Sequence, residues 1–247
     1  MSVHGTPSWG SPSVLRRIGL CPETDGLWPM QSGLDFVTSL LRLGGFSRGE
    51  ARSRAEAALA RVRLTDVQDR RAGGYSKGMR QRLKLAQAIA HDPDLILLDE
   101  PLNGLDPVNR RHVIDLVKAL GREGKTVVVS SHVLHEVEAM TRRIVLVHKG
   151  RVLAEGEVGE IRALLDAHPH TVAVRARAVR RLARELVALP HVRSLHFGAD
   201  GRWVTAQTAE PDAFYAAVQD QGAACGVTEM YPTDDDLESV FRYLVPK

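Results

Sequence analysis

Residues 75–101 read YSKGMRQRLKLAQAIAHDPDLILLDEP and decide the fold of this chain. Ser76 is a good N-cap, and the apolar residues after it recur at helical spacing, so we expect a helix from Ser76 to Ala90. The pair Asp92-Pro93 ends that helix. Residues 95–98 are a continuous apolar run, which is typical of a strand buried on both faces of a parallel sheet. The stretch therefore predicts a loop, a helix and a core strand, in that order.

The residues after this strand continue to alternate between helical and extended patterns. The expected elements are a helix over 107–120, a strand over 126–129, a helix over 132–140 and a strand over 144–147. Strands that alternate with helices at these intervals indicate a doubly wound α/β domain. Residues 150–159 are then consistent with a hairpin at the edge of that domain.

The residues before the deciding stretch are mostly helical. Residues 14–20 are consistent with a short strand, and from Leu34 to about Arg71 the apolar and Ala-rich positions follow helical spacing. Gly44-Gly45 interrupts that spacing, so we expect two helices with a break between them. These helices form a helical subdomain over about residues 31–75.

The pattern changes near Ala167. From there the chain reads as strand, helix, two strands, helix and strand up to Tyr231, followed by a helix over 237–244. This order predicts a small α+β appendage of βαββαβ type. We therefore expect one domain over residues 1–160 and a second over residues 167–247.

The composition is that of an ordinary globular protein rather than a disordered or collagen-like one. The chain has 247 residues, of which 44% are hydrophobic and 26% charged, and its formal net charge is +3. So small a charge, with an aromatic content of 5%, argues against nucleic acid as a partner. The pI of about 9.0 is compatible with an anionic membrane surface.

The sequence also predicts where the protein works. No apolar run approaches the roughly 20 residues that span a bilayer, and no signal-peptide pattern follows Met1. Cys21 and Cys225 are 204 positions apart and form no metal-type pair, which indicates reduced thiols. We expect a cytoplasmic protein that serves a membrane, if it serves one, as a subunit bound to its inner face.

Ser76 and Gly78 lie where a loop becomes a helix. The free N–H groups and the positive dipole end at such a point bind phosphate, and Gly78 permits a close approach of backbone or phosphate. A Ser N-cap with a nearby Gly is also a common helix start. On these residues alone both interpretations stay open.

Asp99 and Glu100 are adjacent carboxylates at the end of the predicted core strand, where ligand crevices lie in open α/β sheets. Two such acids can divide the work. One holds Mg²⁺, directly or through water, and the other polarises a water for attack on a phosphate. The alternative is that the pair caps the next helix.

Taken in order, these features resemble the ATPase subunit of an ABC transporter, and the resemblance covers essentially the whole chain. The matching segments are the Q-loop entry at 18–23, the signature motif at 75–79, the Walker B strand at 95–100, the D-loop at 103–106, the switch histidine His132 and the Leu-Glu-x-Val-Phe segment of the exporter group at 237–241. The resemblance implies an α/β fold. That fold is a P-loop NTPase-like ABC ATPase domain with a helical subdomain and a small α+β carboxy-terminal appendage.

The resemblance also implies a catalytic centre that uses ATP and Mg²⁺. In it, Asp99 would support the Mg²⁺ ion and Glu100 would polarise the attacking water. His132 would contact the γ-phosphate, although a solvated or core histidine is the alternative.

The remaining implied site residues bind ATP or a second subunit. The nucleotide held by a second ABC ATPase subunit, in a homodimer or a heterodimer, would be covered by Ser76, Lys77, Gly78 and Met79. Glu23 would reach the Mg²⁺ ion through water. Asp106 would lie at the dimer interface, with a plain helix cap before Pro107 as the alternative.

Three positions depart from the family pattern. Lys77 and Met79 stand where the signature consensus has Gly and Gln, and Glu23 stands where the Q-loop has Gln. Lys77 either adds positive charge near phosphate or is solvated. A carboxylate at Glu23 still reaches Mg²⁺ through water, but it cannot donate a hydrogen bond unless it is protonated.

A larger departure is that the sequence contains no phosphate-binding loop. The nearest match to G-x-x-x-x-G-K-[ST] is Gly124-Lys125-Thr126, which has Ala119 where the first Gly is required. We interpret it as a helix-to-strand turn. We expect the loop, with its strand and helix, to lie upstream of Met1, so that the domain is amino-terminally truncated and the strand over 95–98 is poorly covered.

Two functions follow from the resemblance. The first is an ATP-hydrolysing subunit that couples closure of two such subunits to export through a membrane permease. The second is a truncated, non-catalytic partner subunit or gene relic that cannot bind ATP alone. Trp28 is a candidate contact for the permease, with local packing as the alternative. The five arginines of residues 175–184 are interpreted as a solvated helix face rather than a membrane or nucleic-acid patch.

Overall fold

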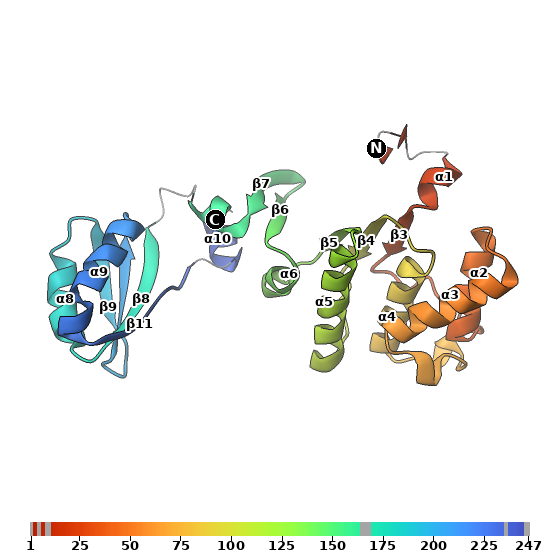
Figure 1. Cartoon of the computed structure of the whole chain (residues 1–247), viewed down its shortest axis with the longest axis horizontal. Coiled ribbons are helices and arrows are strands. Elements are labelled where there is room, and N and C mark those ends of the chain that lie inside the picture. The colour runs from red at the N-terminus through yellow and green to blue at the C-terminus, as the bar shows by residue number, and fades with distance from the viewer. Residues whose placement is uncertain (1, 4–5, 8–10, 164–168, 235–236, 245–247) are drawn as a thin grey trace. The chain divides into compact units, whose positions relative to one another are not determined.

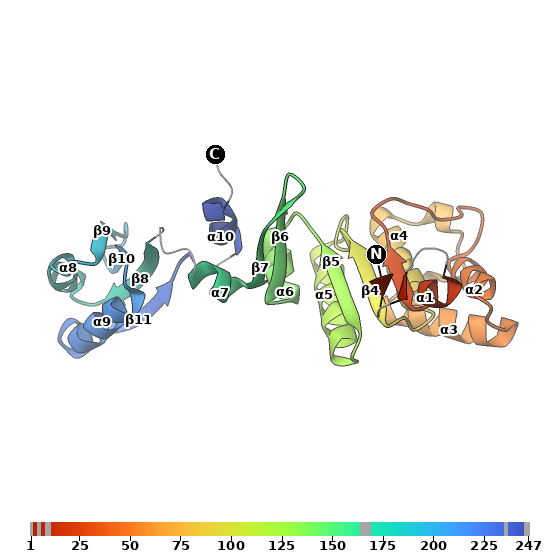
Figure 2. The ribbon, with the colours of Figure 1, turned by 90° about the horizontal axis from the view of Figure 1, so that it is seen from above.

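The computed structural model describes residues 2–3, 6–7, 11–163, 169–234 and 237–244. They form two compact units, Met1–Met140 and Thr141–Lys247, which are described separately (Figures 1 and 2). The predicted edge at 160–167 overlaps residues outside the described ranges. The structure divides earlier because β6 (Arg143–His148) pairs antiparallel with β7 (Arg151–Glu157), which confirms the expected hairpin.

A parallel three-stranded sheet forms the centre of the first unit. Its strands are β3 (Ile18–Cys21), β4 (Leu95–Asp99) and β5 (Thr126–Ser130), in the order β3-β4-β5. Leu98 lies opposite Cys21 on one side and Val129 on the other. Because all three strands run in the same direction, their carboxyl ends meet at one edge of the sheet.

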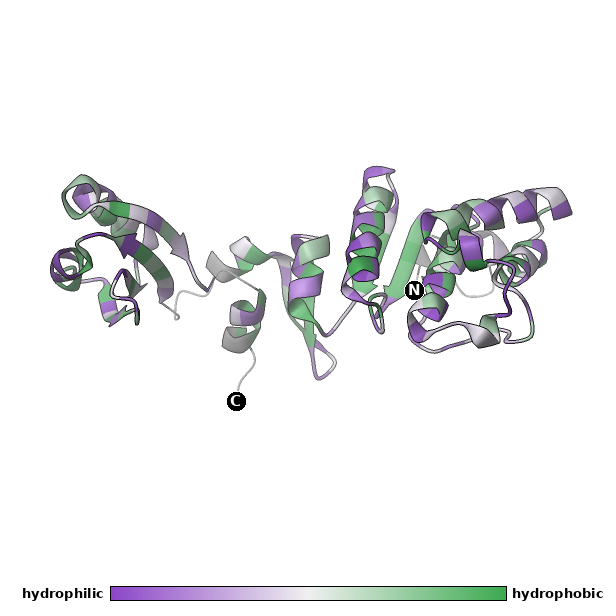
Figure 3. Cartoon of the chain, turned by 90° about the horizontal axis from the view of Figure 1, so that it is seen from below, coloured by the Kyte–Doolittle hydropathy of each residue, from purple (hydrophilic) through white to green (hydrophobic). Residues whose placement is uncertain are grey.

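Only one face of this sheet is well covered. Ile96 and Leu98 are buried in the core together with apolar residues of the helices, whereas Leu20 and Val128 are 51% and 52% exposed. In Figure 3 the apolar stretches of the central strands are green, the colour of hydrophobic residues. In β4 itself, Ile96 and Leu98 are buried, whereas Leu95 and Leu97 are only partly buried. The expectation of a strand buried on both faces is therefore wrong for the face of Leu95 and Leu97.

Two capped helices and two short 3-10 turns form the predicted helical subdomain. α2 (Gly33–Leu43) begins where Ser32 Oγ accepts the Asp35 N–H at 3.0 Å, and α3 (Arg48–Arg61) begins with a Ser47–Glu50 capping box. The break at Gly44-Gly45 separates them as predicted. The 3-10 turns η1 (Thr65–Val67) and η2 (Ala72–Gly74) follow.

The remaining elements of the first unit mostly agree with the sequence. α4 (Lys77–Ile89) and α5 (Pro107–Arg122) lie where predicted, and α6 (Leu134–Met140) begins two residues later than expected. The strand expected over 14–20 is partly wrong. A proline at the first helical position starts the short α1 (Pro12–Leu15), so β3 begins only at Ile18. β1 (Ser2–Val3) and β2 (Thr6–Pro7) pair with each other.

The second unit contains the predicted βαββαβ order. After β6 and β7, its elements are α7 (Val158–Ala163), β8 (His170–Ala176), α8 (Val179–Val187), β9 (Val192–Phe197), β10 (Trp203–Thr208), α9 (Pro211–Cys225), β11 (Val227–Pro232) and α10 (Leu237–Leu244). The sheet has the antiparallel order β11-β8-β10-β9. Val174 and Val204 from the sheet pack with Leu182 and Phe214 from α8 and α9, so these two helices cover one face.

Both cysteines are buried and free, as predicted. Burial raises the pKa of the Cys21 thiol to about 12, so it is a neutral thiol at physiological pH. Among the described helices, none combines the length and the hydrophobicity that a membrane crossing requires.

Candidate functional site

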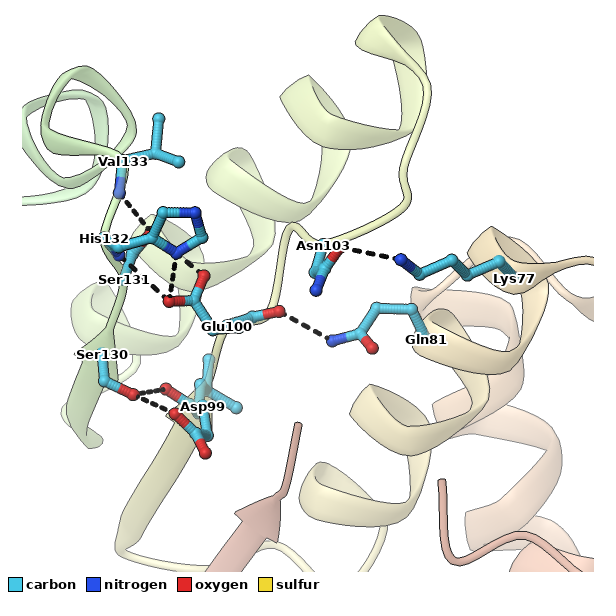
Figure 4. Close-up of polar contacts among 10 residues, drawn as sticks. Lys77, Gln81, Asp99, Glu100, Asn103, Ser130, Ser131, His132 and Val133 are labelled. Carbon is cyan, nitrogen blue, oxygen red and sulfur yellow. Dashed lines mark hydrogen bonds and ion pairs between the residues drawn. The ribbon is translucent and has the colours of Figure 1, made fainter. Parts of the chain in front are cut away.

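The site lies at the edge where the carboxyl ends of the parallel strands meet (Figure 4). Asp99 is the last residue of β4, and Ser130 is its neighbour at the end of β5. The Ser130 hydroxyl donates a hydrogen bond to Asp99 Oδ1 at 2.6 Å. This bond orients the Asp99 carboxylate at the end of the strand.

Glu100 is the central carboxylate of the site. Its Oε1 accepts two hydrogen bonds from His132, one from the backbone N–H at 3.0 Å and one from Nδ1 at 2.7 Å. Gln81 Nε2 of α4 donates to the Glu100 carbonyl at 3.2 Å. Glu100 has a left-handed φ of 46°, which is uncommon for a residue with a side chain. The contacts to His132 and Gln81 fix this turn.

The Glu100 carboxylate changes the acid–base behaviour of His132. The hydrogen bond from Nδ1 and the negative charge of Glu100 both favour the imidazolium, and they raise the pKa of His132 above its ordinary value of 6.5. The His132 side chain is 78% exposed, whereas that of Glu100 is 16% exposed. The histidine therefore faces solvent and can also contact a bound group.

We expect an NMR titration to give His132 a pKa above 6.5, and Glu100→Gln to return it toward 6.5. The contact stabilises the fold fully below pH 6.5, and that stabilisation is lost as the pH rises through the higher folded pKa. His132→Asn identifies the signal among the ten histidines. A His132 pKa at or below 6.5 in the wild-type chain would contradict the geometry.

The signature segment starts α4 close to the loop that follows β4. Ser76 Oγ accepts the Met79 N–H at 3.2 Å, which confirms the predicted N-cap. A Cβ at Gly78 would lie 3.1 Å from the Gly104 carbonyl, so the two backbones approach closely here. Lys77 Nζ donates to Asn103 Oδ1 at 3.0 Å, so Lys77 is tied to the loop rather than fully solvated.

Two predicted site residues lie outside this cluster. Asp106 caps α5, because its Oδ1 accepts the Asn109 N–H at 2.9 Å. Glu23 is exposed, and its carbonyl accepts a hydrogen bond from the buried Lys84 ammonium at 2.6 Å. Lys84 also pairs with Asp25 at 3.3 Å, so α4 holds the segment that carries Glu23.

The sequence did not single out several residues that position the site. Ser130 and Ser131 directly follow a predicted strand, and that position was the available signal. Gln81 and Lys84 lie on a predicted helix, where their burial shows only in three dimensions. Trp28 is 40% exposed and packs edge-on against Phe36 at 5.5 Å between ring centroids, so it does take part in local packing.

The carboxylates at this edge of the sheet fit a Mg²⁺ ion bound together with a nucleotide better than a metal site made of protein ligands alone. In the described part of the chain there is no cluster of three His, Cys, Asp or Glu residues that could hold a metal. Mg²⁺ usually needs only one or two carboxylates, because water and substrate phosphates complete its coordination. Asp99 meets that requirement.

Gly124-Lys125-Thr126 is a helix-to-strand turn, as the sequence predicts. α5 has ended at Arg122, Gly124 has a left-handed φ of 84°, and β5 begins at Thr126. Lys125 Nζ pairs with Asp92 Oδ1 at 2.5 Å. Lys125 is therefore not the lysine of a phosphate-binding loop.

Comparisons with known proteins agree with this fold. The family model described as "ABC transporter" matches residues 3–103. Among solved structures, the chain is similar to the dimeric ATP-binding cassette MJ0796 in a post-hydrolysis state bound to ADP and Pi. The TM-score is 0.54 and the identity 30%, and the match covers 59% of this chain and 65% of that one.

Sequence relatives are ABC transporter proteins. NatA of Bacillus subtilis is 38% identical over 63% of this chain and 64% of its own length. DrrA of Streptomyces peucetius, a daunorubicin/doxorubicin resistance ATP-binding protein, is 37% identical over 72% of this chain and 56% of its own length. The human phospholipid-transporting ATPase ABCA7 is 31% identical over 92% of this chain and 11% of its own. The chain thus matches less than two thirds of each.

The fold of the first unit is the ABC ATPase fold, a variant of the P-loop NTPase architecture. Residues 3–103 are similar to the ATP-binding domains of ABC transporters.

Proposed function

We propose that this chain is an ATP-hydrolysing subunit of an ABC transporter that energises export through a membrane permease. The observation that carries the proposal is the 2.7 Å hydrogen bond from His132 Nδ1 to Glu100 Oε1, beside Asp99 at the edge of the sheet. A held carboxylate next to a second carboxylate on a core strand is suited to activating water beside a magnesium-bound phosphate.

Each site residue has a distinct proposed task. Bound Mg²⁺-ATP supplies the phosphoanhydride, and the ion neutralises charge on its phosphates. Asp99, oriented by Ser130, is the residue we assign to hold the ion. Glu100 would accept the proton of the attacking water, and His132 would orient Glu100 and contact the γ-phosphate.

The signature segment supports binding of the terminal phosphate. The first N–H groups of α4 have no partner within the helix, and they lie at the positive end of its dipole. Ser76 and Gly78 begin this helix, with Lys77 and Met79 beside them. We assign these four residues to the nucleotide of a second ABC ATPase subunit, and Asp106 to the interface between the two subunits.

The phosphate-binding loop in this proposal comes from polypeptide outside the 247 residues. The sequence contains no such loop, and the half-exposed Leu20 and Val128 leave an apolar sheet face for a further layer of structure. That layer is either a longer form of this protein or a partner subunit. We place the assembly in the cytoplasm, peripheral on the inner face of the membrane, with Trp28 as a candidate permease contact.

A second candidate is a non-catalytic partner subunit. The absence of a phosphate-binding loop from the sequence favours it, because Glu100 would then have no substrate of its own. In that case Ser76 and Gly78 would still complete a site whose phosphate loop belongs to another subunit. The two candidates differ in whether Glu100 of this chain activates the water that hydrolyses ATP.

The test is ATP turnover by the membrane assembly isolated through a tag on this chain. We expect a permease to co-purify, and Gly78→Asp to lower turnover about tenfold or more, since a carboxylate there repels phosphate. Gly49→Asp places the same residue at the same helical position of α3, where a Cβ meets nothing within 4 Å, and should leave turnover unchanged. Equal turnover in the two variants would rule out both candidates.

A further inference from the structure

A polar cavity lies in the carboxy-terminal unit, at one end of its sheet. It has a volume of about 550 Å³ and is lined by Arg175, Ala176, Arg177, Arg202, Thr228 and Glu229. These residues come from the end of β8, the start of β11 and the turn before β10 (Figure 2). Half of the lining residues are arginines, and one is an acid.

The acid in this cavity is already neutralised. Arg175 Nη1 lies 2.6 Å from Glu229 Oε1. Within the described ranges, neither Arg177 nor Arg202 forms an ion pair with a carboxylate, and both side chains are exposed. Asp200 Oδ1 lies nearby, where it accepts the Arg202 backbone N–H at 3.0 Å. The cavity thus presents two unneutralised guanidinium groups.

The backbone holds these arginines in place. The Ala176 N–H donates to the Arg202 carbonyl at 3.0 Å, which brings the two arginine-bearing segments together. The Arg177 N–H donates to the Gly226 carbonyl at 3.1 Å, and the Arg177 stem packs so closely that a Cβ at Gly226 would lie 3.2 Å from it. The backbone at both arginines is therefore fixed, so that a ligand has only their side chains to order.

We infer that this cavity binds a phosphate group of a small phosphorylated molecule or of a lipid headgroup. The fork of N–H donors on a guanidinium matches phosphate oxygens in pairs, and two such forks face the cavity. Arg180, Arg181 and Arg184 are exposed on the adjacent α8 and do not line the cavity. The interpretation of residues 175–184 as a solvated helix face thus fits these three arginines of α8, but not Arg175 or Arg177.

The test is a titration of the chain at physiological ionic strength, ~0.15 M. The probes are inorganic phosphate, glycerol 3-phosphate, and phosphatidylcholine vesicles with and without phosphatidylglycerol. Binding is followed through the backbone amides of Ala176, Arg177 and Arg202, or by vesicle sedimentation. Soluble probes that bind point to a phosphorylated metabolite, and binding only to phosphatidylglycerol vesicles points to a headgroup.

Matched variants locate the binding. We expect Arg177→Gln with Arg202→Gln to weaken it about tenfold or more, whereas Arg180→Gln with Arg181→Gln, which removes the same charge outside the cavity, changes it by less than about twofold. Arg177→Lys with Arg202→Lys keeps the charge and the packing. It should weaken binding by a factor between those of the two Gln pairs. Equal weakening in the two Gln pairs, or no binding of any probe, would overturn the inference.

Discussion

Glu100→Gln is expected to lower ATP turnover by the membrane assembly about 100-fold or more, within the range for loss of a general base. The amide cannot accept the proton of the attacking water. Its oxygen can still accept the hydrogen bond from His132 Nδ1, so the geometry of the site should survive. We therefore expect nucleotide binding to change by no more than a few-fold. Turnover and binding measured on the same preparation check both parts.

The matched control is Glu123→Gln. Glu123 follows α5 and its Oε1 lies 2.7 Å from Arg61 Nη2, with both side chains well exposed. Exposed pairs of this kind contribute about 0–1 kcal/mol, so turnover should remain near that of the wild type. If Glu100→Gln also leaves turnover near wild type while Gly78→Asp lowers it, the chain is the non-catalytic partner. The sites that hydrolyse ATP would then use another subunit's acid.

Periodicity and end signals in the sequence were sufficient to predict most elements. Caps at Ser76 and Asp106 and the apolar run over 95–98 located α4, α5 and β4 within a few residues. The division between the units was less predictable. The residues that form β6 read as one more strand of the parallel sheet, and only pairing shows that this strand turns back on β7.

The site residues at the ends of strands could be predicted from the sequence. Residues whose role depends on their burial in the fold were harder to predict. Asp99 ends β4, Glu100 follows it, and His132 lies two residues after β5, so their convergence follows from the parallel order. Lys84 is a polar residue of a helix in the sequence, yet it is 2% exposed in the fold. Its role appears only when its ammonium group is seen to hold the Glu23 carbonyl, a contact between residues 61 positions apart.

Gly19→Ala is expected to destabilise the first unit by about 3 kcal/mol, at the upper end for overpacking a core. Gly19 lies in β3 on the face that packs against α4, and a Cβ there would lie 2.0 Å from the Ala88 carbonyl oxygen and 2.9 Å from Pro93 Cγ. A backbone carbonyl cannot move aside as a flexible side chain can. The strand and the helix must therefore separate. In a unit of this size the Tm should fall by roughly 10 °C.

Gly121→Ala is the control. It tests whether the loss of stability in Gly19→Ala comes from the steric clash of the new Cβ rather than from the replacement of a glycine as such. Gly121 lies in α5, where a Cβ would meet nothing within 4 Å, so alanine there should stabilise the helix by up to ~1 kcal/mol. Denaturant unfolding, with hydrogen exchange of the β4 amides, compares the two variants. Similar stabilities would mean that β3 and α4 do not touch. A selective loss in Gly19→Ala would show that this contact sets the distance between the strand that leads to Glu23 and the helix that carries Ser76 and Gly78.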